Sequence, residues 1–109
     1  MSTNALLAIS TFPGREIAEQ IVRTLLDKHL IACGNVLPQV RSLYQWKGNI
    51  EESAETLVLF KLSAENYDAF EKELRVQHPY EVPEIIAFPI TQGLPDYLNW
   101  IAENSRGAA

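Results

Sequence analysis

The sequence His78-Pro79-Tyr80-Glu81-Val82-Pro83-Glu84-Ile85-Ile86 joins a helical pattern to an extended one. A residue that precedes proline is disfavoured in the α conformation, so the helix must end before Pro79. We expect a strand from Val82 to Thr91 to follow. An imidazole, a phenol and two carboxylates lie at this junction, and each of these groups can bind a metal or exchange a proton.

The other elements follow from apolar periodicity on either side of that junction. In chain order, the pattern predicts a strand at Leu6–Ile9, a helix with Pro13 in its first turn, a strand from Leu30 to Trp46, the loop Lys47–Asn49, a strand from Ile50 to Leu62, a helix capped by Ser63 and, after Gly93, a short last helix. Pairing of Trp46 with Ile50 would place Arg41 opposite Glu55.

The prolines predict the order of the strands in the sheet. Proline has no N–H group to donate, so it is confined to edge strands and bulges. Pro38 lies in the second strand, Pro83 and Pro89 lie in the fourth, and the first and third strands contain none. We therefore place strands two and four at the edges. This is an α+β, ferredoxin-like split βαβ sandwich, with a long hairpin between the second and third strands and a short C-terminal helix.

Length and composition indicate a single domain spanning residues 1–109. The chain is 47% hydrophobic and 21% charged, as is ordinary for a soluble protein. Its net charge of −5 repels phosphate backbones, so we expect no nucleic acid partner, whereas cations are acceptable. There is neither an apolar run of about 20 residues nor a basic leader, so we expect a cytoplasmic protein with no membrane insertion. The single cysteine, Cys33, excludes an internal disulfide.

The long hairpin predicts an oligomer. Strands usually run about 5–6 residues, so these arms would project beyond the two helices. Apolar side chains near the tip would then be exposed, and such patches usually meet a partner; they are Tyr44, Trp46 and Ile50. We also interpret Trp100 as an interface anchor. Long, unblocked sheet edges favour strand pairing between chains.

Four segments together resemble the CutA family of divalent-cation tolerance proteins. They are Leu30–Asn35, Ser42–Glu51, His78–Ile86 and Asp96–Ile101. The resemblance implies ferredoxin-like subunits assembled as a tight homotrimer through their long strands. It also implies a cytosolic protein linked to copper and other divalent cations, with no catalysed reaction. Bacterial members with proposed metal ligands look as though they use a cysteine and two histidines, at positions that are Ser10, Gln77 and His78 here.

His78 is the best metal-ligand candidate, because a neutral imidazole binds Cu(II) and Zn(II). The alternative is that His78 only donates a hydrogen bond at a helix end. Other side chains are predicted to line a ligand cleft nearby: Ser10, Cys33, Lys61, Tyr80, Glu81 and Glu84. For Cys33 the favoured interpretation is a small buried hydrophobe, with ligand binding as the minor alternative. Glu81 and Glu84 face opposite sides of an extended strand unless Pro83 bends it.

Two hypotheses for function compete at this point. The first is a homotrimer that binds a divalent cation, Cu(II) foremost, or a small ligand in clefts between subunits, without catalysis. The second is a trimer that binds a small molecule or anion there and signals to an unidentified protein partner, for which Lys47 and Lys61 matter more than His78. A small enzyme using Cys33 or His78 and a purely structural hub remain further alternatives. No nucleophile motif or phosphate-binding glycine loop is present, so we expect no organic cofactor.

Overall fold

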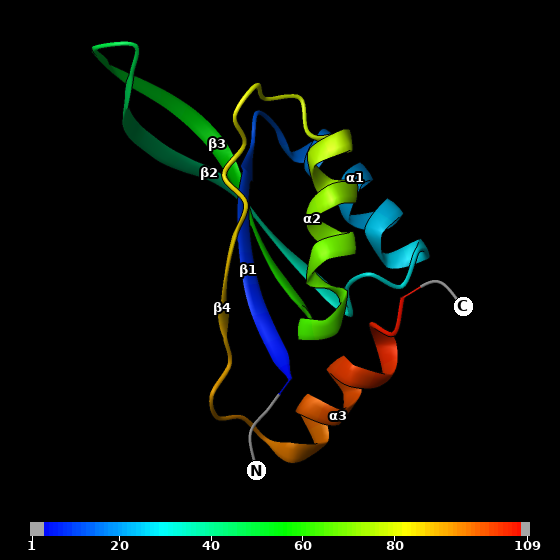
Figure 1. The fold of residues 1–109 in the computed structure, drawn as a ribbon. Coiled ribbons are helices and arrows are strands. Elements are labelled where there is room, and N and C mark those ends of the chain that lie inside the picture. The colour runs from blue at the N-terminus through cyan, green and yellow to red at the C-terminus, as the bar shows by residue number, and fades with distance from the viewer. Residues whose placement is uncertain (1–3, 108–109) are drawn as a thin grey trace.

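The strands and helices follow one another along the chain in the order that the apolar periodicity predicts (Figure 1). The computed structural model describes residues 4–107, so both ends of the predicted domain, residues 1–3 and 108–109, lie outside the described residues. The elements are, in chain order, β1 (Ala5–Phe12), α1 (Arg15–Asp27), β2 (Cys33–Trp46), β3 (Asn49–Ser63), the 3-10 helix η1 (Ala64–Asn66), α2 (Tyr67–Gln77), β4 (Ile86–Pro89) and α3 (Pro95–Asn104).

The strand order confirms the prediction from the prolines. The four strands pair antiparallel in the order β2-β3-β1-β4, so the strands without proline are central and those with proline are at the edges. This order with two crossing helices is the split βαβ arrangement, and the fold is α+β.

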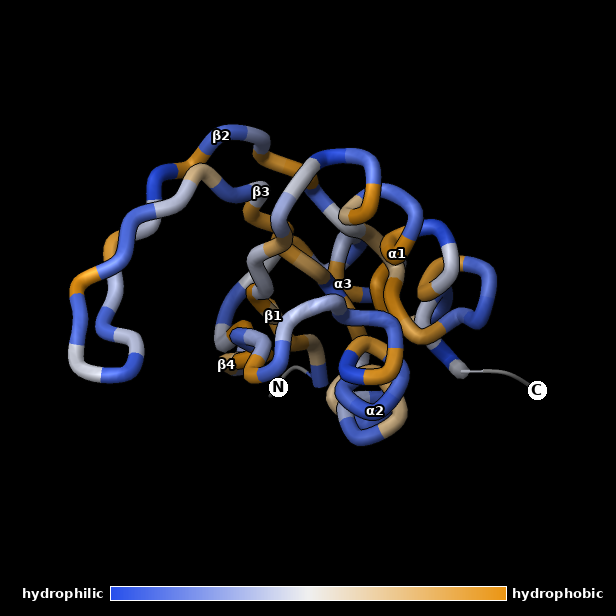
Figure 2. Tube along the Cα trace, turned by 90° about the horizontal axis from the view of Figure 1, so that it is seen from above, coloured by the Kyte–Doolittle hydropathy of each residue, from blue (hydrophilic) through white to orange (hydrophobic). Residues whose placement is uncertain are grey.

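The hydrophobic core lies between one face of the sheet and the helices α1 and α2. Alternate residues of the central strands point into it, as the two-residue period of a strand requires; Ala8, Phe12, Val58 and Phe60 are fully buried there. Phe60 meets Phe70 of α2 edge to face, with ring centroids 5.1 Å apart. In Figure 2 the hydrophobic segments of the sheet and helices face one another.

Gly34 allows α1 to pack closely on β2. A Cβ atom at this position would lie 2.8 Å from Cγ1 of Val22. Any larger residue at position 34 would therefore push the helix away from the sheet.

The opposite face of the sheet is apolar, and α1 and α2 leave it uncovered; α3 packs at its end, where Ile101 meets Ala5. Register places Leu7 beside Phe88 and Ile9 between Leu59 and Ile86 on this face. Phe88 and Ile86 are exposed. The sheet therefore presents an uncovered apolar surface.

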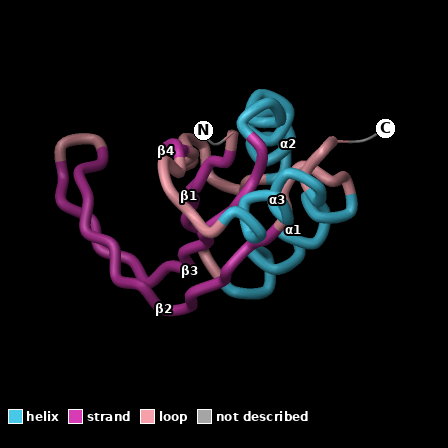
Figure 3. Tube along the Cα trace, turned by 90° about the horizontal axis from the view of Figure 1, so that it is seen from below, coloured by secondary structure: helices cyan, strands magenta, loops and turns pink. Residues whose placement is uncertain are grey.

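β2 and β3 continue past the other strands as a two-stranded arm, residues 40–55 (Figures 1 and 3). β1 reaches only as far as Thr56 on β3, and beyond that point β3 pairs with β2 alone. The register shifts between Leu37 and Val40, where Pro38 lies and Gln39 has a φ of 64°. Pro38 thus lies at a bulge in this edge strand, and Figure 3 shows the arm curving away from the sheet.

The predicted pairing within the arm is wrong by one residue. Lys47 and Gly48 have φ of 50° and 84°, as a two-residue hairpin turn requires, so Trp46 pairs with Asn49 rather than with Ile50. Arg41 therefore lies opposite Ala54 and not opposite Glu55. Nη2 of Arg41 instead lies 3.5 Å from Oε2 of Glu52.

Three predicted element boundaries also change. α1 begins at Arg15 after an N-cap at Gly14, so Pro13 precedes the helix. β2 begins at Cys33, because His29 adopts a φ of 57° and the chain turns before the strand. The fourth strand has only four residues, Ile86–Pro89, instead of running from Val82 to Thr91.

Ser63 does not cap a helix with its side chain. Its hydroxyl lies 2.9 Å from the hydroxyl of Ser105, and its backbone N–H donates to the same Ser105 oxygen. This pair fixes the end of α3 against the end of β3.

Candidate functional site

A cavity of about 620 Å³ lies between the arm and the segment that follows α2. We call it the hairpin pocket. Its aromatic walls are Tyr44, Trp46 and Tyr80. Its charged side chains are Arg41, Glu51, Glu55, Glu81 and Glu84. The segment between α2 and β4 thus supplies one wall, and the arm supplies the other.

Glu55 and Tyr80 form the buried contact of the hairpin pocket. The Tyr80 hydroxyl donates a hydrogen bond of 2.6 Å to Oε2 of Glu55. Burial, and then this bond to a carboxylate, raise the pKa of Tyr80 well above its usual value. Tyr80 therefore remains a neutral hydrogen-bond donor across the physiological pH range.

His78 ties the start of this segment to β1. Its Nε2 lies 2.8 Å from the carbonyl oxygen of Thr11 and so must donate to it, while its Nδ1 accepts the backbone N–H of Tyr80 at 3.2 Å. The ring stacks on Phe12 with centroids 4.6 Å apart. Burial lowers the pKa of His78 below its ordinary value, against smaller raising effects of the Thr11 carbonyl and Glu55.

Both ring nitrogens of His78 are therefore engaged in hydrogen bonds. A metal ion can take one of them only after the bond to Thr11 or to Tyr80 has broken. The hydrogen bond at a helix end, which the sequence left as the alternative, is present.

The six residues predicted to line one cleft lie in three places. Tyr80, Glu81 and Glu84 line the hairpin pocket. Ser10 lies fully buried, on the side of β1 that faces the helices, and its hydroxyl has no hydrogen-bond partner within residues 4–107. The remaining two, Cys33 and Lys61, lie opposite each other on β2 and β3.

Cys33 and Lys61 share a hydrogen-bond acceptor. The Cys33 thiol donates to Oδ1 of Asn35 at 3.6 Å, and the Lys61 ammonium group donates to the same oxygen. Cys33 is half-buried. Neither of these two side chains lines the hairpin pocket.

The residues predicted at a subunit interface are all exposed large side chains. Tyr44, Trp46 and Ile50 lie on the arm, and Trp100 lies on α3, where it stacks on Tyr97 with centroids 5.4 Å apart. This exposure is what an interface requires of a single chain, although it does not identify the partner.

Sequence reasoning did not identify Glu55 as a site residue. We predicted it as a cross-strand partner of Arg41 and, with Glu51 and Glu52, as part of a solvated or inter-subunit polar face. The available signal was its position, because Glu55 is the last carboxylate before the apolar run Leu57–Phe60 of the third strand. A charge that enters a buried strand needs a specific partner.

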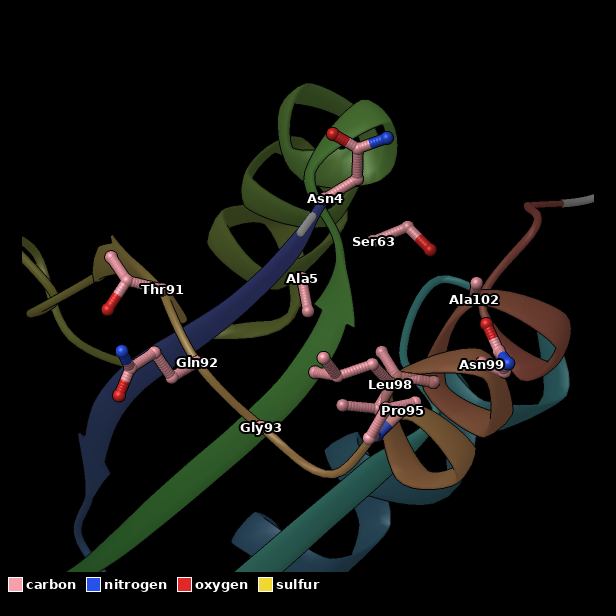
Figure 4. Close-up of a pocket in the computed structure, with 11 residues that line it drawn as sticks. Asn4, Ala5, Ser63, Thr91, Gln92, Gly93, Pro95, Leu98, Asn99 and Ala102 are labelled. Carbon is pink, nitrogen blue, oxygen red and sulfur yellow. The ribbon is translucent and has the colours of Figure 1, made fainter. Parts of the chain in front are cut away.

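A second cavity, of about 470 Å³, lies between the start of β1, the end of β3 and α3 (Figure 4). No charged side chain lines it. In Figure 4 the side chains of Asn4, Thr91 and Gln92 point apart rather than toward a common centre. The cavity therefore lacks the converging polar groups that are typical of ligand sites.

Residues 6–104 match the family described as CutA1 divalent ion tolerance protein. The divalent-cation tolerance protein CutA of Thermus thermophilus is 36% identical over 99 residues, which are 91% of this chain and 96% of that protein. Protein CutA of Mus musculus is 44% identical over 94 residues, 86% of this chain but 53% of the relative. The chain therefore spans about half the length of the mouse relative.

Solved structures carry the same fold. CutA of Xylella fastidiosa superposes with a TM-score of 0.91 at 39% identity, covering 94% of this chain and 99% of that one. The periplasmic divalent cation tolerance protein CutA of Archaeoglobus fulgidus gives 0.89 at 36% identity, covering 93% and 98%. These matches confirm the resemblance that four short segments indicated. Among the described residues, no helix has the length and apolarity needed to cross a membrane.

Proposed function

We propose, because this chain belongs to the CutA1 family of divalent ion tolerance proteins, that it acts in divalent-cation tolerance as a non-catalytic homotrimer. Its clefts between subunits hold a divalent cation, Cu(II) foremost, or a small ligand, without an organic cofactor. We place this activity in the cytoplasm. The observation that carries the proposal is the pair of open sheet edges joined to an exposed arm.

The two open edges support a ring of copies. Within residues 4–107, β2 pairs only with β3 and β4 only with β1, so the outer edge of each is unpaired. Because the two edges differ, a contact of β2 with β4 between copies is head-to-tail, and such contacts close into rings when the rotation allows. Unpaired edges that natural proteins leave uncovered are sites of pairing with another chain.

Exposed apolar side chains follow the same edges. They lie on the arm, on the segment before β4 and on β4 itself: Leu43, Tyr44, Trp46, Ile50, Val82, Ile86 and Phe88. Large apolar side chains exposed together in this way support an interface. A copy seated against the arm would enclose the hairpin pocket, and this supports a cleft between subunits.

The first test is the mass of the particle in solution. Light scattering after size-exclusion chromatography at micromolar concentration is expected to give three times the 12.3 kDa of one chain. A particle of 12.3 kDa contradicts the trimer.

The second test is calorimetry with Cu(II) on the assembled protein and on His78→Ala. We expect heat of binding beyond that of an unrelated acidic protein of similar charge. If His78 is a ligand, the Ala variant binds Cu(II) at least about tenfold more weakly, which is about 1.4 kcal/mol. Binding no stronger than that of the acidic control contradicts direct metal binding.

One observation favours the alternative, a trimer that binds a small molecule or anion and signals to a protein partner. Within residues 4–107, no three His, Cys, Asp or Glu side chains lie close enough to hold a metal ion. Lys61 then supplies the cationic group that an anion requires. A screen of anionic metabolites is expected to give hits that Lys61→Ala loses, and hits unchanged by this substitution argue against the alternative.

A further inference from the structure

We propose that the hairpin pocket receives an organic cation with N–H donors, an ammonium or guanidinium group, which pairs with Glu55. The inference rests on the proposed function, in which the cleft holds a cation or a small ligand, and it names the chemical class of that ligand. Its central observation is that Glu55 is a buried carboxylate with no cationic partner among residues 4–107.

Only 8% of the surface of Glu55 is exposed. A buried carboxylate is costly unless a positive group or several hydrogen bonds compensate it. The hydrogen bond that Glu55 receives comes from the neutral hydroxyl of Tyr80. In the described part of the chain, the ion pairs of Lys and Arg side chains all involve other carboxylates.

The charges that face Glu55 do not compensate it. Burial lowers the pKa of His78, and its Nδ1 accepts the N–H of Tyr80, so this ring is neutral. Arg41 lines the hairpin pocket, but its guanidinium group is paired with Glu52 at 3.5 Å. The other charged side chains of the pocket are carboxylates, so its field attracts cations and repels anions.

The walls of the hairpin pocket suit an organic cation. Tyr44, Trp46 and Tyr80 are aromatic, and a cation over an aromatic ring is attracted by the negative charge of the ring face. Nζ of Lys47 lies 5.7 Å from the centroid of the Trp46 ring, so this ring already attracts one cation.

A bare metal ion fits the hairpin pocket poorly. The volume of about 620 Å³ is that of a site for a small organic molecule. Metal ions in proteins take four or more ligands, and in residues 4–107 no three candidate side chains come together. N–H donors are needed because a carboxylate bonds most strongly to charged hydrogen-bond donors.

Two sources can supply such a group: a free amine or guanidine, or a Lys or Arg side chain of a second copy. The first experiment is calorimetry of the full chain with agmatine, with 1,4-diaminobutane and with tetramethylammonium, which has no N–H group. We expect the first two to bind, and tetramethylammonium to bind at least about tenfold more weakly.

Glu55→Gln is expected to reduce the affinity for agmatine by roughly 10- to 100-fold, as for loss of a charge-assisted hydrogen bond. Glu65→Gln is the matched control, because Glu65 is an exposed carboxylate of η1 that does not line the hairpin pocket and takes part in none of the ion pairs of the described residues. We expect its affinity to stay within about twofold of that of the original chain.

The second experiment measures oligomer dissociation by sedimentation for the same two variants. If no free amine binds but Glu55→Gln raises the dissociation constant at least about tenfold and Glu65→Gln does not, the cation belongs to the second copy. The proposal is overturned if the original chain and the two variants bind agmatine with equal affinity. It is also overturned if neither calorimetry nor sedimentation shows any effect of Glu55→Gln.

Two checks exclude a folding artefact. Glu55→Gln is expected to melt at the same temperature as the original chain or higher, since it removes a buried charge and no cationic partner. Independently of any variant, agmatine must shift the NMR amide signals of Tyr80 and Trp46 but not that of Val76 on α2. Shifts confined to other regions contradict the site.

The outcome also separates this inference from the proposed function. A trimer that binds Cu(II) but shows neither amine binding nor an effect of Glu55→Gln keeps the proposed function and removes this inference. A chain that binds agmatine through Glu55 while remaining monomeric keeps this inference and contradicts the proposed trimer. This outcome is possible because the residues of the hairpin pocket all come from one chain.

Discussion

At the scale of single residues, His78 shows how burial selects one role for a versatile side chain. The imidazole lies 7% exposed between Phe12 and Tyr80. One nitrogen donates to Thr11 and the other accepts from Tyr80, so the protein needs the neutral ring. A second proton on Nδ1 would face the N–H of Tyr80, donor against donor.

This arrangement predicts a dependence of stability on pH. Burial lowers the pKa of folded His78 below the 6.5 of the free side chain, so below about pH 6.5 the unfolded chain binds more protons than the folded chain. The free energy of unfolding therefore falls as pH decreases through 6.5, by at most about 1.4 kcal/mol per pH unit, until the folded ring is protonated too.

Urea unfolding between pH 7.5 and 5 measures this effect. His78→Gln is expected to lose stability at pH 7.5 and to show a flatter decline toward pH 5. His29→Asn on the surface is the control, because Asn tolerates the φ of 57° found there. If His78→Gln declines as steeply as the control, His78 is not the group responsible.

At the scale of elements, the two-residue turn Lys47-Gly48 determines which residues of the arm face each other. Positive φ at both positions gives the turn whose twist matches a hairpin. A three-residue loop would have shifted every pair by one and turned each side chain to the other face. The turn thus places Glu55 opposite Val40 and leaves Arg41 free to pair with Glu52.

Substitution at Gly48 tests this turn. No other atom lies within 4 Å of a Cβ built at Gly48, so Gly48→Ala is expected to cost about 1–2 kcal/mol of stability through backbone conformation alone. Gly48→Asn is the matched control, since Asn adopts positive φ readily at the same open position, and it should cost only roughly a few tenths of a kcal/mol. Equal losses in denaturant unfolding would contradict this account.

At the scale of the whole molecule, the arm and the uncovered face of the sheet leave a single chain incomplete. The arm holds exposed side chains where it has no third strand to support it (Figure 3). Isolated two-stranded hairpins are only marginally stable in water. A neighbouring copy that packs against the arm would provide the missing support.

Ile50→Asp is therefore expected to raise the dissociation constant of the oligomer at least about tenfold while the chain stays folded, as for a buried interface residue. Ile50 is 71% exposed in one chain, and Val76 on α2, at 74%, is the matched control. Val76→Asp should leave the particle mass unchanged in sedimentation. Equal effects of the two substitutions argue against an interface at the arm.

Much of the fold could be predicted from local signals. The periods of apolar residues identified the helices and strands, and the prolines identified the two edge strands, because a missing N–H group acts at the residue itself. The length of the fourth strand and the register of the arm could not be predicted in this way. They depend on which backbone groups find partners across the sheet.

By itself, the sequence determined the α+β class, the order of the strands and membership of the family, since these follow from patterns of apolarity, proline and short motifs. Only the tertiary structure decided which polar side chains come together. It separated Ser10 and Cys33 from Tyr80, engaged both nitrogens of His78 and buried Glu55 beneath Tyr80. The reason is physical: proximity between distant residues, and the loss of water around them, arise only when the sheet and helices pack.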